Sequence, residues 1–190
     1  MRTSIFFVFV MYACTHAGEK HQDPAAYVDP FIGTGGKIGL GHGNTFPGAC
    51  YPFGMIQLSP DNGGQGWEYC SGYHYQDSFI VGFTHTHLSG TGVGDLADIS
   101  LMPTSKEIKE KYFIQENDFI DVELTTSEFV GMHRYKFNDK PKKQHLVLNL
   151  GFNINRDRPV DTYIQKRLPD LVTGYRFSGG WADVHRVFFA

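Results

Sequence analysis

Short runs of alternating apolar and polar side chains, separated by turn-forming residues, restrict the fold of this chain more than any other feature. The clearest run is 144–150, where a leucine at every second position alternates with His145, Val147 and Asn149. Such alternation is the pattern of a half-buried strand. Runs of the same type, or short apolar runs with β-forming residues, occur at 52–59, 79–83, 99–102, 121–126, 129–137, 171–177 and 185–189. A spacing of about ten residues between short strands is typical of an antiparallel β-sandwich, so we predict an all-β fold.

The composition agrees with this prediction and excludes some classes of function. The chain has 190 residues, a length that suits one domain, with 22 glycines, 9 prolines and an aromatic share of 15%. Its net charge of −3 offers nothing to attract a polyanion, so we expect no nucleic-acid partner. The charged run 106–111 is expected to form either one brief helix or a solvated surface segment.

The first residues have the pattern of an export signal. A basic Arg2 precedes an apolar core, 5–12, that is too short to span a bilayer. We therefore predict a signal peptide over residues 1–18 and a secreted, periplasmic or cell-surface protein. Because 10–14 resembles an imperfect lipobox, Cys14 is an alternative site of lipid attachment, as in an outer-membrane lipoprotein.

The predicted folded domain spans residues 26–190. It ends within the apolar run 187–190, which predicts that the domain is incomplete at its C-terminus, since an unprotected apolar strand invites aggregation. Cys50 and Cys70 are expected either to form a disulfide in an oxidising compartment or to remain unpaired thiols.

The segment 66–98 is the strongest candidate for ligand contact, because it combines aromatic rings, histidines, acids and glycines. Trp67, between a glycine and an acid, is expected to offer its flat face to the apolar side of a sugar ring. The nearby tyrosines Tyr69, Tyr73 and Tyr75 are expected either to assist or simply to pack as core.

His85 and His87 are two positions apart, so on a strand both would point the same way. They are expected to make polar contacts to a sugar; the alternatives are bonds within a loop, or a metal site completed by Asp95 or Asp98. Glu68, Asp77, Asp95 and Asp98 are the nearby acids, but their spacing does not single out a catalytic pair. The glycine-dense run 33–43 lacks the ending of a phosphate-binding loop, and the sequence has no Gly-x-Ser-x-Gly elbow.

Several motifs, in order, resemble the N-terminal domain of glycoside hydrolase family 92, the secreted exo-α-mannosidases. They are Val-Asp-Pro-Phe-Ile-Gly-Thr (28–34), Phe-Pro-Gly-Ala (46–49), Pro-Phe-Gly-Met (52–55), Cys-Ser-Gly-Tyr (70–73), Gly-Phe-Thr-His-Thr-His-Leu-Ser-Gly-Thr-Gly (82–92), Val-Gly-Met-His-Arg-Tyr (130–135), Gly-Tyr-Arg-Phe (174–177) and Gly-Trp-Ala (180–182). The resemblance therefore covers nearly everything after the signal segment.

The resemblance implies a supersandwich-like β-sandwich that packs on an (α/α)6 barrel, which this chain lacks. It also implies a calcium-dependent, inverting exo-α-mannosidase acting on mannosides such as N-glycans or mannan. The catalytic residues and most calcium ligands would belong to the barrel, so none is assigned here and this chain alone is expected to be inactive. The sugar contacts expected from this chain are Trp67, Glu68, His85, His87 and Asp95. A stand-alone carbohydrate-binding β-sandwich is the alternative.

Overall fold

The computed structural model describes residues 23–36, 44–90, 92–105, 120–138, 141, 143–155 and 157–190. The predicted signal peptide (1–18), the lipid site at Cys14 and the brief helix at 106–111 lie outside these ranges. The described part is built from strands, with two single 3-10 turns, and its elements run in this order: η1 (Pro24–Tyr27), β1 (Ala49–Cys50), β2 (Gln57–Asp61), η2 (Trp67–Tyr69), β3 (Gly82–Thr84), β4 (Ser100–Thr104), β5 (Ile120–Thr126), β6 (Gly131–Phe137), β7 (His145–Asn149), β8 (Arg158–Leu168), β9 (Leu171–Gly179) and β10 (His185–Phe189).

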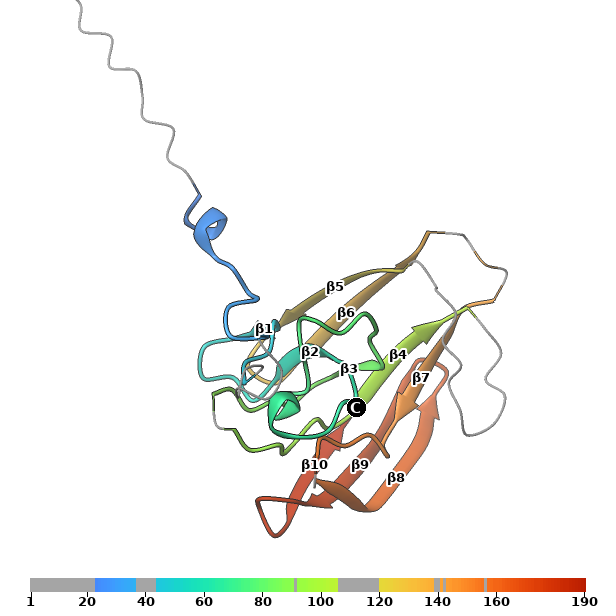
Figure 1. Ribbon diagram of the computed structural model, residues 1–190. Helices are drawn as coiled ribbons and strands as arrows, with labels where there is room; N and C mark the ends of the chain where they lie inside the picture. Colours follow the sequence, from blue (N-terminus) through green and yellow to red (C-terminus); the bar gives the residue numbers. More distant parts are fainter. Residues whose placement is uncertain are drawn as a thin grey trace, which may run out of the picture.

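The strands form three antiparallel groups, so the prediction of an all-β, antiparallel fold is confirmed. A five-stranded sheet has the order β1-β2-β3-β4-β7, a three-stranded sheet has the order β10-β9-β8, and β5 pairs with β6 as a hairpin. In Figure 1 the β5–β6 hairpin and the β8–β10 sheet lie on opposite sides of the strands of the larger sheet. The predicted ligand residues lie on the segments 62–81, 85–90 and 92–99, which connect β2 to β3 and β3 to β4 of the larger sheet.

Three of the expected strands have boundaries that differ from the prediction. The strand expected at 52–59 begins only at Gln57 and continues through Pro60 and Asp61, although both residue types are common in turns. The strand expected at 99–102 continues through Pro103, although proline is uncommon inside strands. β3 pairs with β4 only at Leu101. Pro103 lies beyond this pairing, so no hydrogen bond to β3 is lost because proline has no N–H. The run 79–83 contributes only its last two residues to β3.

β8 was not predicted at all, although it is the longest strand. Its eleven residues are almost all exposed, so its sequence has no alternation of buried and exposed positions to recognise. It is held by its ladder to β9, which continues over nearly its whole length with two irregularities. The strand therefore depends on backbone pairing and not on a buried face.

The interior of the domain is unusually polar. Among the residues that the structure describes, six apolar ones are buried (Leu58, Cys70, Phe83, Ala97, Ile99 and Ile154), against fifteen polar or charged ones. Large apolar side chains are exposed on the β5–β6 hairpin, including Phe129 and Met132, and on the β8–β10 sheet, including Val160 and Phe188. The described residues include no helix long and apolar enough to cross a membrane.

The two cysteines of the described domain are free thiols. Cys50 is exposed and Cys70 is buried, which decides between the two alternatives raised by the sequence. The Cys70 sulfur lies 3.0 Å from Asn44 Oδ1, and burial raises the pKa of this thiol. Cys70 is therefore a packed core residue.

Candidate functional site

Trp67 and Glu68 begin the short 3-10 turn η2 and lie at the surface. The turn follows Gly66, whose φ of 111° is a conformation that favours glycine. The Gly66 N–H donates to Asn155 Oδ1 at 2.6 Å, which ties this turn to the segment before β8. Trp67 is 57% exposed, so much of its ring is free to meet a ligand.

One edge of the Trp67 ring lies against the glycine-rich loop. A methyl group on Gly92 would collide with the six-membered part of the indole, and Gly92 also has a φ of 68°. Both observations require glycine at this position. The predicted sugar platform is thus positioned by the loop that follows the two histidines.

His87 is buried, with 4% exposure, and its ring is engaged within the domain. Nδ1 lies 2.8 Å from the carbonyl oxygen of Gln57 and therefore donates to it. Nε2 lies 2.8 Å from Thr84 Oγ1 and 3.1 Å from Asp61 Oδ1. These contacts favour a role in holding β2 against β3 over direct contact with a sugar.

His85 points in a different direction and belongs to a second hydrogen-bond chain. Its Nδ1 donates to the carbonyl oxygen of Ile99 at 2.6 Å, and its Nε2 lies 3.1 Å from Nε2 of His133. The His133 Nδ1 lies 2.8 Å from the hydroxyl of Tyr135. Since His85 Nδ1 must carry the proton, its neutral ring accepts from His133, and Tyr135 donates to the other nitrogen of His133.

With these donor and acceptor roles, both imidazoles are neutral. Burial lowers the pKa of His85, and burial together with the neighbouring His85 lowers the pKa of His133 to about 4. Burial also raises the pKa of the Tyr135 phenol. His85 and His87 therefore do not converge on one ligand or metal ion, as the spacing alone had suggested, because β3 ends at Thr84 and the strand geometry does not continue through them.

Asp95 and Asp98 lie on the strained loop that leads into β4. Leu96, Ala97 and Ile99 all have positive φ angles, which non-glycine residues rarely adopt. The loop is pinned to Thr86, which accepts from Asp98 N at 2.9 Å and donates to Asp98 Oδ2 at 2.7 Å. Asp95 is buried, with 3% exposure, and its Oδ2 accepts from Ala182 N at 3.3 Å.

Arg176 of β9 is the centre of the polar interior and was not predicted. Its side chain is completely buried and pairs with the carboxylates of Asp98 and Asp157. It also donates to Ser178 Oγ at 2.8 Å and to the carbonyl oxygens of Leu150 and Phe152 at 3.2 and 3.0 Å. The guanidinium therefore joins β9 to the loop before β4 and to the segment after β7.

A signal for this buried arginine is visible in the alternation of β9. Arg176 and Ser178 are two positions apart and share the inward face, whereas Tyr175 and Phe177 stack on each other on the other face. The sequence shows the alternation but not which face points inward. Hydrophobicity alone selects the wrong face.

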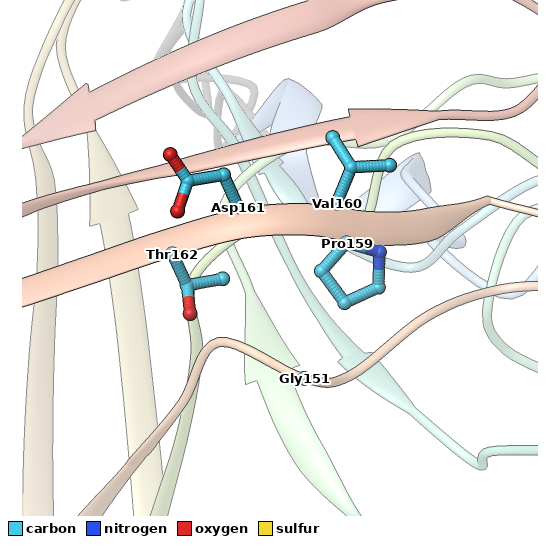
Figure 2. A pocket seen from close by; sticks show the side chains of 5 residues that line it. All are labelled: Gly151, Pro159, Val160, Asp161 and Thr162. Carbon is cyan, nitrogen blue, oxygen red and sulfur yellow. The ribbon is translucent and has the colours of Figure 1, made fainter.

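The surface hollows among the described residues include two whose linings contain none of the five expected sugar contacts, although Tyr75 lines the first. One, of about 380 Å³, is lined by Asp29, Phe31, Gly35 and Tyr75. The other, of about 330 Å³, lies on β8 beside the segment that follows β7, and Figure 2 shows its lining residues Pro159, Val160, Asp161 and Thr162 with Gly151. The first hollow has aromatic walls, since the rings of Phe31 and Tyr75 meet edge to face at 5.3 Å.

Comparison with known proteins agrees with this architecture. The family model described as the glycosyl hydrolase family 92 N-terminal domain matches residues 27–119 and 111–190. A family GH92 α-mannosidase from Bacteroides thetaiotaomicron, solved in complex with mannoimidazole, superposes with a TM-score of 0.74 at 26% identity. That match covers 86% of this chain and 24% of the solved one, and a second structure of the enzyme gives the same TM-score and identity.

A curated relative from Arthroderma benhamiae, called an uncharacterized secreted glycosidase, is 28% identical over 147 residues. The match covers 64% of this chain and 18% of that protein. The fold and these matches define a glycoside hydrolase domain. The chain belongs to glycosyl hydrolase family 92 as its N-terminal domain, which confirms the resemblance found in the sequence. It spans about a quarter of the solved enzymes that it matches.

Proposed function

We propose that this chain is the carbohydrate-contacting N-terminal part of an inverting, calcium-dependent exo-α-mannosidase that acts on mannosides such as N-glycans or mannan. The observation that carries the proposal is the exposed indole of Trp67, which the glycine-rich loop holds in place. The superposition on an α-mannosidase that was solved with mannoimidazole supports a mannoside as the ligand class.

In this proposal the predicted contacts have two kinds of role. Trp67 stacks on the sugar ring, and Glu68, the next residue of the same turn, accepts hydrogen bonds from its hydroxyls. His85 and His87 hold the loop from inside, because their ring nitrogens are bonded within the domain. Asp95 anchors the loop to the β9–β10 turn through Ala182.

Calcium is not assigned to residues of this chain. Calcium prefers six to eight oxygen ligands. Among the described residues one cluster of potential metal ligands occurs, formed by Asp95, Asp157 and His185, and it includes an imidazole. We propose instead that calcium is held by the (α/α)6 barrel, together with the catalytic acid and base. The partners of this chain are then the barrel domain and a mannose-containing oligosaccharide.

The proposal predicts that the 190-residue chain alone has no mannosidase activity. The test compares this chain with a version joined to a family 92 catalytic barrel, using a panel of α-linked mannobioses. Turnover by the joined version and none by the short chain is the expected result. Turnover by the 190-residue chain alone would refute the proposal that the catalytic acid and base belong to the barrel.

The exposed aromatic hollow beside η1 favours a second candidate function, that of a stand-alone carbohydrate-binding domain. Asp29, Phe31 and Tyr75 line it. Calorimetry with mannose and mannobiose distinguishes the candidates. The second function would be supported if the chain alone binds the sugar, Tyr75→Ala abolishes that binding and Trp67→Ala does not.

Export of the protein is part of the proposal. Its support is the apolar segment after Arg2 and the secreted relative from Arthroderma benhamiae. We propose that residues 1–18 direct export and that Cys14 is the residue lipidated if the protein is anchored at the outer membrane. Metabolic labelling with a radiolabelled fatty acid tests the anchor, since Cys14→Ser must abolish incorporation.

A further inference from the structure

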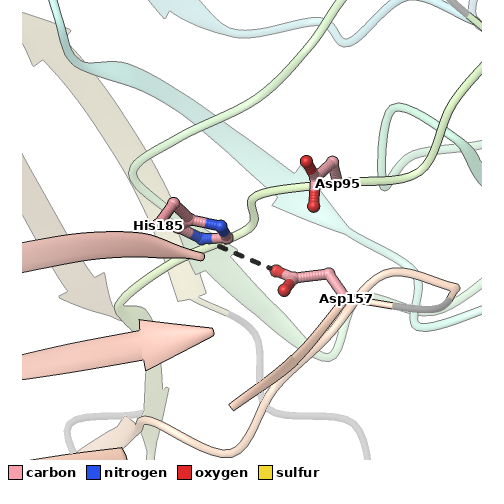
Figure 3. Close-up of side chains that lie close together, drawn as sticks. All are labelled: Asp95, Asp157 and His185. Carbon is pink, nitrogen blue, oxygen red and sulfur yellow. Dashed lines mark ion pairs between the residues drawn. The ribbon is translucent and has the colours of Figure 1, made fainter. Parts of the chain in front are cut away.

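Two buried carboxylates and an imidazole meet where the loop before β4, the start of β8 and the start of β10 come together. Asp95, Asp157 and His185 each offer one ligand atom, and these atoms lie within 4.8 Å of one another. Figure 3 shows the three side chains turned toward a common space, each contributed by a different segment of the chain. Residues at three widely separated positions thus converge.

Two oxygen atoms in this cluster lack a partner. Asp95 Oδ1 and Asp157 Oδ1 are both buried and find no hydrogen-bond donor among the described residues. The second oxygen of each group is engaged, with Asp95 Oδ2 on Ala182 N and Asp157 Oδ2 on Arg176. Burying an unpartnered carboxylate oxygen is costly, so a missing positive ligand is the simplest explanation.

The charges around the cluster point the same way. Arg176 pairs with the buried carboxylates of Asp98 and Asp157, and Asp95 adds a third buried carboxylate. Nε2 of His185 lies 3.2 Å from Asp98 Oδ1 and 3.9 Å from Asp157 Oδ2. With a neutral His185 the buried group carries a net charge of −2, which a divalent cation neutralises. Gly180 keeps the space open, because a methyl group there would collide with Asp95 Oδ1 and lie 3.0 Å from Asp157 Cα.

We propose that Asp95, Asp157 and His185 form a structural site for a divalent first-row metal ion such as Mn²⁺ or Zn²⁺. Carboxylate and imidazole donors together suit these ions. The ion would lock the β9–β10 turn onto the loop that carries Gly92, which supports Trp67. Arg176 would orient the Asp157 carboxylate by its bond to Oδ2, as outer-sphere groups do at metal sites. This inference does not depend on the mannoside proposal.

Binding of Mn²⁺ tests the site, because free Mn²⁺ is counted directly by electron paramagnetic resonance and thiols bind it poorly. The full 190-residue chain is treated with a chelator and then titrated with Mn²⁺. One tightly bound ion per chain is expected, together with a rise in melting temperature, since a ligand of the folded state stabilises it. Asp95→Asn should weaken binding at least about tenfold.

Asp183→Asn is the matched control. This exposed acid lies in the β9–β10 turn but outside the cluster, and its replacement removes the same charge as Asp95→Asn. It should bind Mn²⁺ as the unchanged chain does. Gly180→Ala adds a methyl group without changing charge and should weaken binding as Asp95→Asn does. His185→Gln should also weaken binding.

Three outcomes would overturn the proposal. They are an absence of binding at millimolar Mn²⁺, equal binding by Asp95→Asn and Asp183→Asn, and binding unaffected by His185→Gln. Circular dichroism of each variant establishes that it is folded.

Discussion

The buried arginine on β9 makes the sharpest prediction about what holds this domain together. Arg176→Met keeps much of the side-chain volume but removes the only buried guanidinium among the described residues. Asp98 and Asp157 then lose their positive partner, and the carbonyl oxygens of Leu150 and Phe152 lose a donor. Removing one partner of a buried ion pair costs about 3–5 kcal/mol, because an uncompensated charge is left behind.

Urea unfolding followed by tryptophan fluorescence measures this loss. With a urea dependence of about 2 kcal/mol per molar for a small domain, the midpoint should fall by about 2 M, and a marginal domain would be unfolded in water. Arg176→Lys keeps the charge but not the planar guanidinium, so its urea midpoint should lie between those of the unchanged chain and Arg176→Met. Arg134→Met is the control, because Arg134 and its partner Glu123 are both largely exposed and such pairs contribute about 0–1 kcal/mol. If Arg176→Met lowers the free energy of unfolding by less than about 1 kcal/mol, the view that the ion pairs of Arg176 hold β9 to the larger sheet is refuted.

Further predictions concern the histidine pair, the support of Trp67 and the thiols. Folding keeps His133 neutral, with its pKa lowered from 6.5 to about 4, so its contribution to stability is complete above pH about 6.5 and is lost as the pH falls toward 4. That contribution is at most about 3 kcal/mol and is reduced by water at the partly exposed ring. His133→Gln should flatten this part of the unfolding free energy measured against pH, and an unchanged profile would contradict the lowered pKa of His133. Gly92→Ala should displace the indole of Trp67 and shift its fluorescence in a Trp181→Phe background. Gly90 also has a positive φ but open space around it, so Gly90→Ala introduces backbone strain without the collision and separates the two effects. Ellman's reagent should modify Cys50 quickly and Cys70 only on unfolding in a Cys14→Ser background, and equal rates would contradict the burial of Cys70.

The sequence predicted the strands that bury one face and missed those that do not. The runs 121–126, 129–137 and 144–150 alternate, and they form β5, β6 and β7 at nearly the expected positions. β8 escaped prediction because its side chains are exposed on both faces and only its ladder to β9 holds it. Pro60 and Pro103 suggested strand ends, but strand pairing in the tertiary structure overrode this local signal.

The sequence predicted which segment carries the candidate site, but not how its side chains are arranged in space. The stretch 66–98 does contain the exposed Trp67 and the loop that supports it. The sequence could not show that His85 and His87 face different partners, because this depends on β3 ending at Thr84. It also could not show Asp157, Arg176 and His185 beside Asp95 and Asp98, since these residues lie about sixty to ninety positions apart and only the packing of β8, β9 and β10 brings them together.

The most direct test of the proposed function is the kcat/KM of a barrel-joined version of this chain on α-linked mannobioses, with and without Trp67. If Trp67 is the sugar-contacting wall of the cleft, Trp67→Ala should lower kcat/KM by about 10- to 100-fold, which corresponds to about 1–3 kcal/mol of stacking energy. The second tryptophan, the exposed Trp181, serves as the control, and Trp181→Ala should leave kcat/KM nearly unchanged. An unchanged kcat/KM for Trp67→Ala in an active, folded enzyme would contradict the account.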